Sequence, residues 1–90
     1  MDPIYQELID QRVVLDTGGP IVYLGTLVAV TESVFVLADA DIHDSRLGHA
    51  TPEAYINDAR QSGVSPNRRR VMVMRTAIIS LSQLDDVVTE

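Results

Sequence analysis

The 90-residue sequence has no cysteine, and all seven of its basic residues are arginine. Without cysteine, a disulfide framework, a catalytic thiol and a thiolate-ligated zinc site are all excluded. Apolar residues make up 46% of the chain, which is too many for a disordered protein. At this length we expect one domain, residues 1–90, with a modest core. Association with copies of itself is a common way for such a domain to bury more surface.

Long hydrophobic runs are also missing. The longest apolar stretch, Ile21–Val30, contains Gly25 and Thr26 and is far shorter than the roughly 18 residues that a membrane span needs. The start, Met1-Asp2-Pro3, has no basic region followed by an apolar run, so it does not resemble a secretory signal. We therefore expect a cytoplasmic protein with no membrane partner.

The charge is unevenly distributed along the chain. The net charge of −6 argues against loose attraction to nucleic acid or anionic membranes. Residues 40–70 hold five arginines and four acids, which gives +1, whereas the remainder holds nine acids against Arg12 and Arg75, which gives −7. A local basic cluster on an acidic body is compatible with these totals, and a wholly basic surface is excluded.

Local patterns predict a mainly β protein with two helices. Asp2-Pro3 and Thr51-Pro52 each combine an N-cap residue with a first-turn proline. The first helix should end near Asp10 or Gln11, and the second should cover Pro52–Ser62, ahead of Gly63. The five predicted strands are Arg12–Asp16, Ile21–Thr31, Val34–Ala38, Val71–Met74 and Ile78–Leu81.

The second predicted strand sets the expected architecture. Both of its faces are largely apolar, so both should be covered, and Gly25 near its middle lets the strand bend or bulge. The strands follow one another too closely for parallel crossovers. We therefore expect a small, strongly bent, five-stranded antiparallel barrel, closed or nearly closed. The first helix should cover an open end, and the second is inserted between strands three and four.

Two stretches of the sequence follow a known pattern. The first has an apolar strand, a glycine turn, Gly-x-Leu, an acid and a second apolar strand; the second has an apolar-Arg pair before another apolar strand. The first stretch consists of Val13–Leu15, Gly18-Gly19, Gly25-x-Leu27, Glu32 and Val34–Leu37. The second consists of Met74-Arg75-Thr76 and Ile78-Ile79. Together they resemble the Sm-like (LSm-type) family of small β-barrels, as a divergent member of bacterial or phage type. In that family residues 40–70 would be the variable loop, enlarged by a helix.

The resemblance implies a homo-oligomeric ring in which the fourth strand of one subunit pairs with the fifth strand of the next. It also implies a nucleotide pocket lined by Arg75 and makes RNA the first ligand class. An interface ion pair between Arg75 and an acid such as Asp39 is the alternative. Family members that hold a uridine use an asparagine that would fall near Val34 or Phe35, and Thr76 stands where the motif has glycine.

Asp39, Asp41 and His43 alternate along the chain, with Asp44 beside them. Alternate residues of an extended strand point to one face. Two carboxylates and an imidazole on one face would suit a divalent metal ion or acid–base chemistry. The alternative is the solvated end of a strand that enters a loop.

Arg68, Arg69 and Arg70 follow Asn67 in a predicted loop and are the clearest candidates for binding an anion. Guanidinium forks match phosphate oxygens in two-point contacts. The alternatives are solubility, or pairing with acids of this chain or of a neighbouring subunit. The run lacks the interleaved aromatic residues that are typical of single-strand binding.

Three functions remain open from the sequence. The leading hypothesis is a non-enzymatic, homo-oligomeric Sm-like binding module without a cofactor or catalytic residues, in which Arg75 and the three neighbouring arginines contact RNA. The second is a scaffold ring that does not bind RNA, which the missing asparagine and glycine and the net charge favour. The third is a metal-dependent enzyme that uses Asp39, Asp41 and His43.

Overall fold

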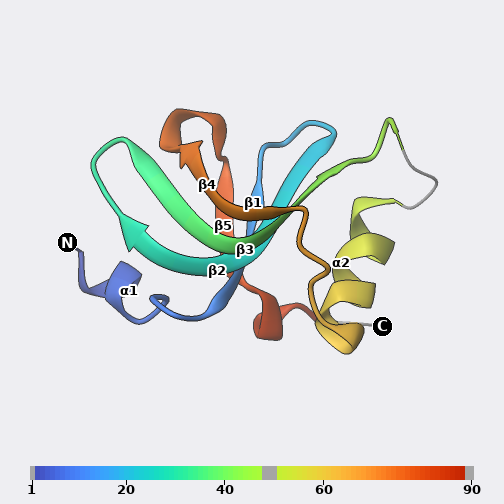
Figure 1. Cartoon of the computed structure of the whole chain (residues 1–90), viewed down its shortest axis with the longest axis horizontal. Helices are drawn as coiled ribbons and strands as arrows, with labels where there is room; N and C mark the ends of the chain where they lie inside the picture. Colours follow the sequence, from blue (N-terminus) through green and yellow to red (C-terminus); the bar gives the residue numbers. More distant parts are fainter. Residues whose placement is uncertain (1, 48–50, 89–90) are drawn as a thin grey trace.

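The computed structural model describes residues 2–47 and 51–88 and contains a single five-stranded sheet (Figure 1). The strands are β1 (Arg12–Asp16), β2 (Ile21–Val30), β3 (Val34–Asp44), β4 (Arg68–Met74) and β5 (Ser80–Gln83). The helices are α1 (Pro3–Gln6) and α2 (Pro52–Ser62), with short 3-10 turns η1 (Arg75–Ala77) and η2 (Leu84–Asp86). Within the described residues, no helix is long and apolar enough to cross a membrane.

All strand pairs in the sheet are antiparallel, in the order β4-β3-β2-β1-β5. β2 and β3 curve strongly along their length, as Figure 1 shows. The prediction of a closed barrel is wrong for the single chain, because β4 and β5 do not pair with each other and the sheet stays open. Its two ends are therefore two strand edges with unpaired backbone groups.

A close backbone contact between β2 and β3 determines which face each residue of β3 occupies. The pairing of Leu24 with Asp41 and of Thr26 with Ala38 leaves one extra residue in β3, which makes a β-bulge opposite Gly25. A Cβ atom at Gly25 would lie 3.1 Å from the Cα of Ala40 and 3.2 Å from the carbonyl oxygen of Ala38. The prediction that Gly25 marks a bulge or bend is confirmed.

Asp39 lies in the bulge with a φ of 48°, a conformation that aspartate adopts more readily than most residues. Strict alternation after Leu37 would turn Asp39 toward the protein interior. The bulge instead leaves Asp39 exposed and gives the interior position to Ala40, which is fully buried. Beyond the bulge, the side chains of β3 alternate in the opposite phase, so Asp41 and His43 face α2 rather than the cluster that contains Phe35, Leu37 and Ala40.

The sheet buries apolar residues on both faces, as predicted for the second strand. One cluster contains Val13, Leu15, Leu27, Phe35, Leu37, Ala40 and Val73, with Tyr5, Leu8 and Ile9 of the N-terminal segment packed against it. The other cluster contains Val14, Val22, Leu24, Ala59 and Leu84, with Tyr55 and Ile56 of α2 packed against it. Each fully buried leucine contributes about 1.5–3 kcal/mol by leaving water. The N-terminal segment and α2 pack against opposite faces of the sheet.

Several predicted boundaries differ from the structure, although α2 covers the predicted range Pro52–Ser62. α1 ends at Gln6, and turns lead from it to Asp10, whose φ is 66°. β3 runs to Asp44 rather than Ala38, because its pairing with β2 resumes after the bulge. β4 begins at Arg68, so the arginine run lies in a strand rather than in a loop. β5 begins at Ser80, two residues later than predicted.

We expect Gly25→Ala to lower the free energy of unfolding by about 1–3 kcal/mol, because the new methyl group would press on the backbone of β3. Urea denaturation followed by circular dichroism measures this change. Gly19→Ala is the matched control, since the nearest atom to its Cβ would be Thr17 Oγ1 at 3.7 Å. Equal stability of the two variants would show that the β2–β3 contact is not tight.

Candidate functional site

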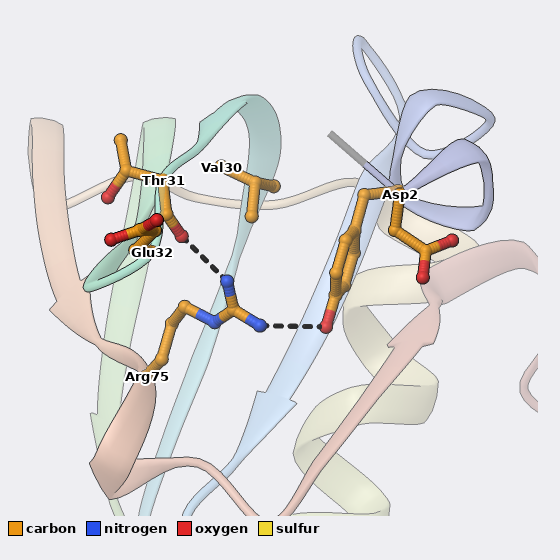
Figure 2. A pocket seen from close by; sticks show the side chains of 6 residues that line it. Asp2, Val30, Thr31, Glu32 and Arg75 are labelled. Carbon is orange, nitrogen blue, oxygen red and sulfur yellow. Dashed lines mark hydrogen bonds between the residues drawn. The ribbon is translucent and has the colours of Figure 1, made fainter.

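Arg75 links three separate parts of the chain at the end of β4 (Figure 2). Its Nη1 donates a hydrogen bond to the carbonyl oxygen of Thr31 at 2.7 Å, and its Nη2 donates to the hydroxyl of Tyr5 at 3.2 Å. The guanidinium carbon lies 5.3 Å from the centre of the Tyr5 ring and 5.4 Å from that of Phe35. These distances are typical of cation–π contacts, so Arg75 joins the N-terminal segment to the turn between β2 and β3.

A cavity of about 460 Å³ opens beside this guanidinium. Its lining residues are Asp2, Tyr5, Val30, Thr31, Glu32 and Arg75. A second hollow of about 240 Å³ is lined by Tyr5, Phe35, Arg75 and residues 78–81. Arg75 and Tyr5 therefore line both hollows, and the carboxylates of Asp2 and Glu32 add negative charge to the larger one.

The sequence singled out Arg75 and Glu32 as motif positions but did not bring them together with the other residues of this cavity. Tyr5 comes from α1, and Thr31 and Glu32 come from the turn after β2, so no local pattern joins them. The alternative partner suggested for Arg75, Asp39, does not bond to it: the acceptors are Thr31 and Tyr5. Pairing of the Arg75 backbone N–H with the Ser33 carbonyl at 2.9 Å fixes the turn against η1.

Arg68, Arg69 and Arg70 lie side by side at the start of the edge strand β4, and all three are exposed. Arg68 and Arg70 are opposite Ala40 and Ala38 of β3. Across residues 2–47 and 51–88, none of these arginines forms an ion pair. Arg68 and Arg69 line a hollow of about 250 Å³ together with Asp39, Pro66 and Asn67. The run lies at the start of β4 and Arg75 follows its end, so about one strand length, roughly 20 Å, separates them.

The structure brings Asp41 and His43 together but separates Asp39 from them. Asp41 and His43 follow the bulge and face α2, where the Tyr55 hydroxyl donates a hydrogen bond to the Asp41 carboxylate. The His43 and Tyr55 rings stack with 3.9 Å between their centres and an angle of 10°. The His43 Nε2 atom is buried without a hydrogen-bond partner in the described part of the chain. The prediction that all three side chains share a face is wrong, because the bulge at Asp39 intervenes.

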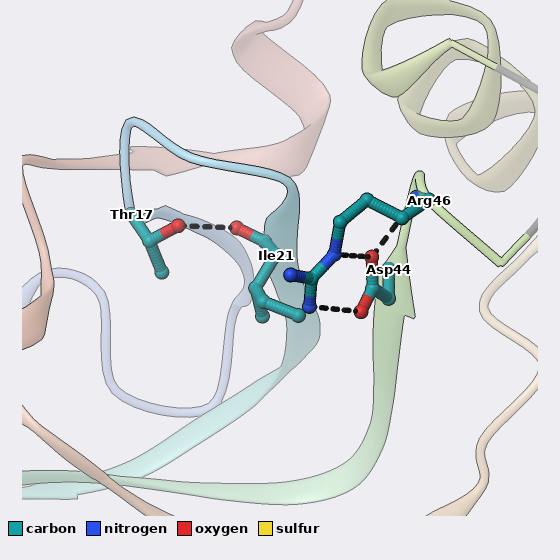
Figure 3. A network of polar contacts seen from close by, with 4 residues as sticks. All are labelled: Thr17, Ile21, Asp44 and Arg46. Atoms are coloured by element: carbon teal, nitrogen blue, oxygen red, sulfur yellow. Dashed lines mark hydrogen bonds and ion pairs between the residues drawn. The ribbon is translucent and has the colours of Figure 1, made fainter.

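No group of three potential metal ligands converges within residues 2–47 and 51–88. Asp41 is engaged by Tyr55, and Asp44 is engaged by Arg46, which donates through its backbone N–H at 2.9 Å and through Nε and Nη2 at 3.0 and 2.7 Å (Figure 3). These hydrogen bonds and the nearby positive charge lower the pKa of Asp44 to about 2. The arrangement gives the predicted metal site no support.

A scan of protein-family models and a search of curated proteins find no match to this sequence. A search of solved structures finds the Sm protein of Pyrococcus abyssii in a complex with a uridine heptamer. The two chains share 15% identity with a TM-score of 0.61, over 92% of this chain and 99% of the other. The fold is Sm-like. The sequence motifs around Gly25 and Arg75 indicated this fold, and the strand order extends the likeness to nearly the whole chain.

In this Sm-like fold, the Tyr55–Asp41 hydrogen bond should make stability depend on alkaline pH. Burial, the hydrogen bond to Asp41 and the charge of that carboxylate raise the pKa of Tyr55. The unfolded chain then loses the phenolic proton first, so the free energy of unfolding should fall as the pH rises above about 10. At neutral pH, Tyr55→Phe should cost about 1 kcal/mol.

Urea denaturation across this pH range measures both effects, and tyrosinate absorbance follows the ionisation itself. Tyr55→Phe should reduce the alkaline loss of stability, whereas Tyr23→Phe should keep it, because no hydrogen bond of the Tyr23 hydroxyl is found in the described structure. The same alkaline loss in Tyr55→Phe as in the unchanged protein would rule out this hydrogen bond as its source.

Proposed function

We propose that this protein is a non-catalytic Sm-like module that assembles with copies of itself into a ring and binds RNA. The observation that carries the RNA part is the cavity beside Arg75, where a guanidinium and an aromatic ring meet at the turn between β2 and β3. A guanidinium can contact phosphate or stack on a base, and a tyrosine ring can stack on a base. The Sm protein that shares this fold is seen with a uridine heptamer, which supports RNA as the ligand class.

Two features support the ring. The outer edges of β4 and β5 are unpaired in the single chain, and such edges tend to pair with another chain. Met72 and Met74 on β4 are 64% and 58% exposed, and Ile79 just before β5 is 71% exposed. Apolar side chains at both edges are what an interface between copies requires. Joining β4 of one copy to β5 of the next would cover both edges and close a ring.

The composition of the cavity indicates how this protein would differ from a uridine-binding relative. No asparagine lies on β3 near Val34 or Phe35, and the turn carries Glu32 instead. A carboxylate accepts hydrogen bonds but donates none, and it repels phosphate. We therefore infer weak, salt-sensitive RNA binding without a built-in preference for uracil.

The second candidate is a scaffold ring that does not bind RNA. Two Arg75 nitrogens are already bonded to Thr31 and Tyr5, and two carboxylates line the same cavity. In this alternative Arg75 serves only to hold α1 against the sheet. The metal-dependent enzyme has no comparable support, since Asp39 is separated from Asp41 and His43. The cytoplasmic location stays a prediction.

Assembly can be tested through the exposed methionines of β4. We expect light scattering of the unchanged protein to give a discrete multiple of the 9.9 kDa chain mass. Met72→Gln/Met74→Gln should weaken assembly by about tenfold or more, because the interface loses two apolar side chains. Leu47→Gln, at a residue that is 86% exposed, is the control and should assemble normally. An unchanged mass for the double variant would place the interface elsewhere.

RNA binding can be tested by fluorescence anisotropy with short uridine-rich and adenine-rich oligonucleotides at low salt. We expect binding that weakens as salt rises. Glu32→Gln should tighten it roughly threefold or more, because it removes a negative charge from the cavity. Asp58→Asn, on the exposed face of α2, makes the same charge change and should leave the affinity unchanged. If neither the unchanged protein nor Glu32→Gln binds at low salt, the scaffold candidate stands instead.

A further inference from the structure

The arginine run at the start of β4 has no ionic partner among residues 2–47 and 51–88. Arg68, Arg69 and Arg70 are exposed, and the described residues contain ion pairs only between Arg12 and Asp85 and between Arg46 and Asp44. Asp39 lines the same hollow as Arg68 and Arg69 without forming an ion pair. Three adjacent guanidinium groups repel one another. Negative charge from outside the described residues would reduce this repulsion and stabilise the strand.

Two acidic residues closely follow β5, the strand at the opposite edge of the sheet. β5 ends at Gln83, and η2 follows with Leu84 buried and with Asp85 and Asp86 exposed. One oxygen of Asp85 accepts a hydrogen bond from Arg12 at 2.7 Å, yet its side chain is 62% exposed. Asp86 forms no ion pair within residues 2–47 and 51–88. The two edges of one chain thus carry opposite charge.

The lengths of the two edge strands bring these charges together when one copy meets another. β4 has seven residues and β5 has four. In an antiparallel pair, the start of β4 lies beside the end of β5. If β5 covers Val71–Met74, Leu81 lies opposite Val73, Ser80 and Ser82 lie opposite the exposed Met74 and Met72, and the three arginines extend about 10 Å beyond Gln83. Asp85 and Asp86 follow Gln83 in the chain, so they would lie close to these three arginines.

We propose that Arg68, Arg69 and Arg70 bind Asp86 and the free oxygen of Asp85 on a second copy of this chain, and that this contact sets the register of the β4–β5 interface. The inference rests on the ring proposed above and names the role of the arginine run within it. Slipping β5 by two residues toward the arginines would leave Met74 without a strand beside it and carry Asp85 and Asp86 past the arginines, opposite Asn67 and Pro66. The charge pairs therefore favour one register, and they also strengthen assembly at low salt.

The same observations weigh against RNA as the first ligand of this run. No aromatic residue lies within Arg68–Arg70, and the net charge of the chain is −6. In an assembled ring the run would lie beside acidic residues of the neighbouring copy, which compete with phosphate. RNA binding by the run is therefore an outcome that the experiment must be able to detect.

A charge exchange tests the proposal. Arg68→Glu/Arg70→Glu should weaken assembly at low salt by about tenfold or more, and Asp85→Arg/Asp86→Arg should do the same. The four changes combined in one chain restore opposite charges across the interface and keep the net charge at −6, as each pair of changes cancels the other. We expect this combined variant to assemble like the unchanged protein in light scattering.

The matched control carries Arg68→Glu/Arg70→Glu together with Glu53→Arg/Asp58→Arg, which also keeps the net charge but places the compensation on α2. We expect it to remain dissociated. Arg12→Ala removes the Arg12–Asp85 pair alone and should assemble. Circular dichroism establishes that each variant is folded, and a combined variant that does not fold is replaced by mixing the two separate double variants, which should then co-assemble.

Assembly of Arg68→Glu/Arg70→Glu at the level of the unchanged protein would overturn the proposal and leave the ring intact. Equal rescue by the α2 control would also overturn it, because net charge alone would then explain the effect. A monomeric unchanged protein would overturn the ring and this contact together. Loss of oligonucleotide binding with normal assembly in Arg68→Glu/Arg70→Glu would assign the run to RNA instead.

Discussion

The backbone of β2 approaches the backbone of β3 so closely at Gly25 that an added Cβ atom would crowd Ala40 and the Ala38 carbonyl oxygen, and the remaining architecture depends on this contact. Opposite the glycine, β3 carries one extra residue, Asp39, with a positive φ. The bulge lets both long strands curve, and a curved sheet can enclose an apolar cluster on its inner face while α2 covers the outer one. A flat sheet of this size would leave one of these clusters exposed to water.

The same bulge determines what the polar residues of β3 do. It turns Asp41 and His43 toward α2, where Tyr55 bonds to one and stacks on the other. These contacts attach α2 to the sheet together with the apolar packing of Ile56 and Ala59. The residues that looked most like a metal site therefore hold a helix in place. At the other end of the curved strands, Arg75 holds α1 in a comparable way and leaves a cavity open beside it.

The sequence predicted those features that arise from local patterns. Thr51-Pro52 and Gly63 mark the ends of α2 through capping, and Gly25 marks the bend because a Cβ atom there would crowd the backbone of β3. The continuation of β3 to Asp44 was missed, because Asp39 breaks the alternation by which strands are recognised. The sequence predicts a loop for the arginine run because the pairing of this run with Ala38 and Ala40 depends on a strand far away in the sequence. The cavity at Arg75 combines residues from three segments, which no local pattern reveals.

An open sheet with two unpaired edges is the physical basis of the proposed ring. Hydrogen–deuterium exchange resolved by mass spectrometry reports directly on these edges, because backbone N–H groups that pair with another chain exchange slowly. In the protein at micromolar concentration, we expect residues 68–74 and 80–83 to be protected as strongly as β2. On dilution both segments should lose together the protection of their outward-facing N–H groups, while the N–H groups that pair with β3 and β1 stay protected. Rapid exchange of both segments at every concentration, with β1, β2 and β3 still protected, would contradict the account.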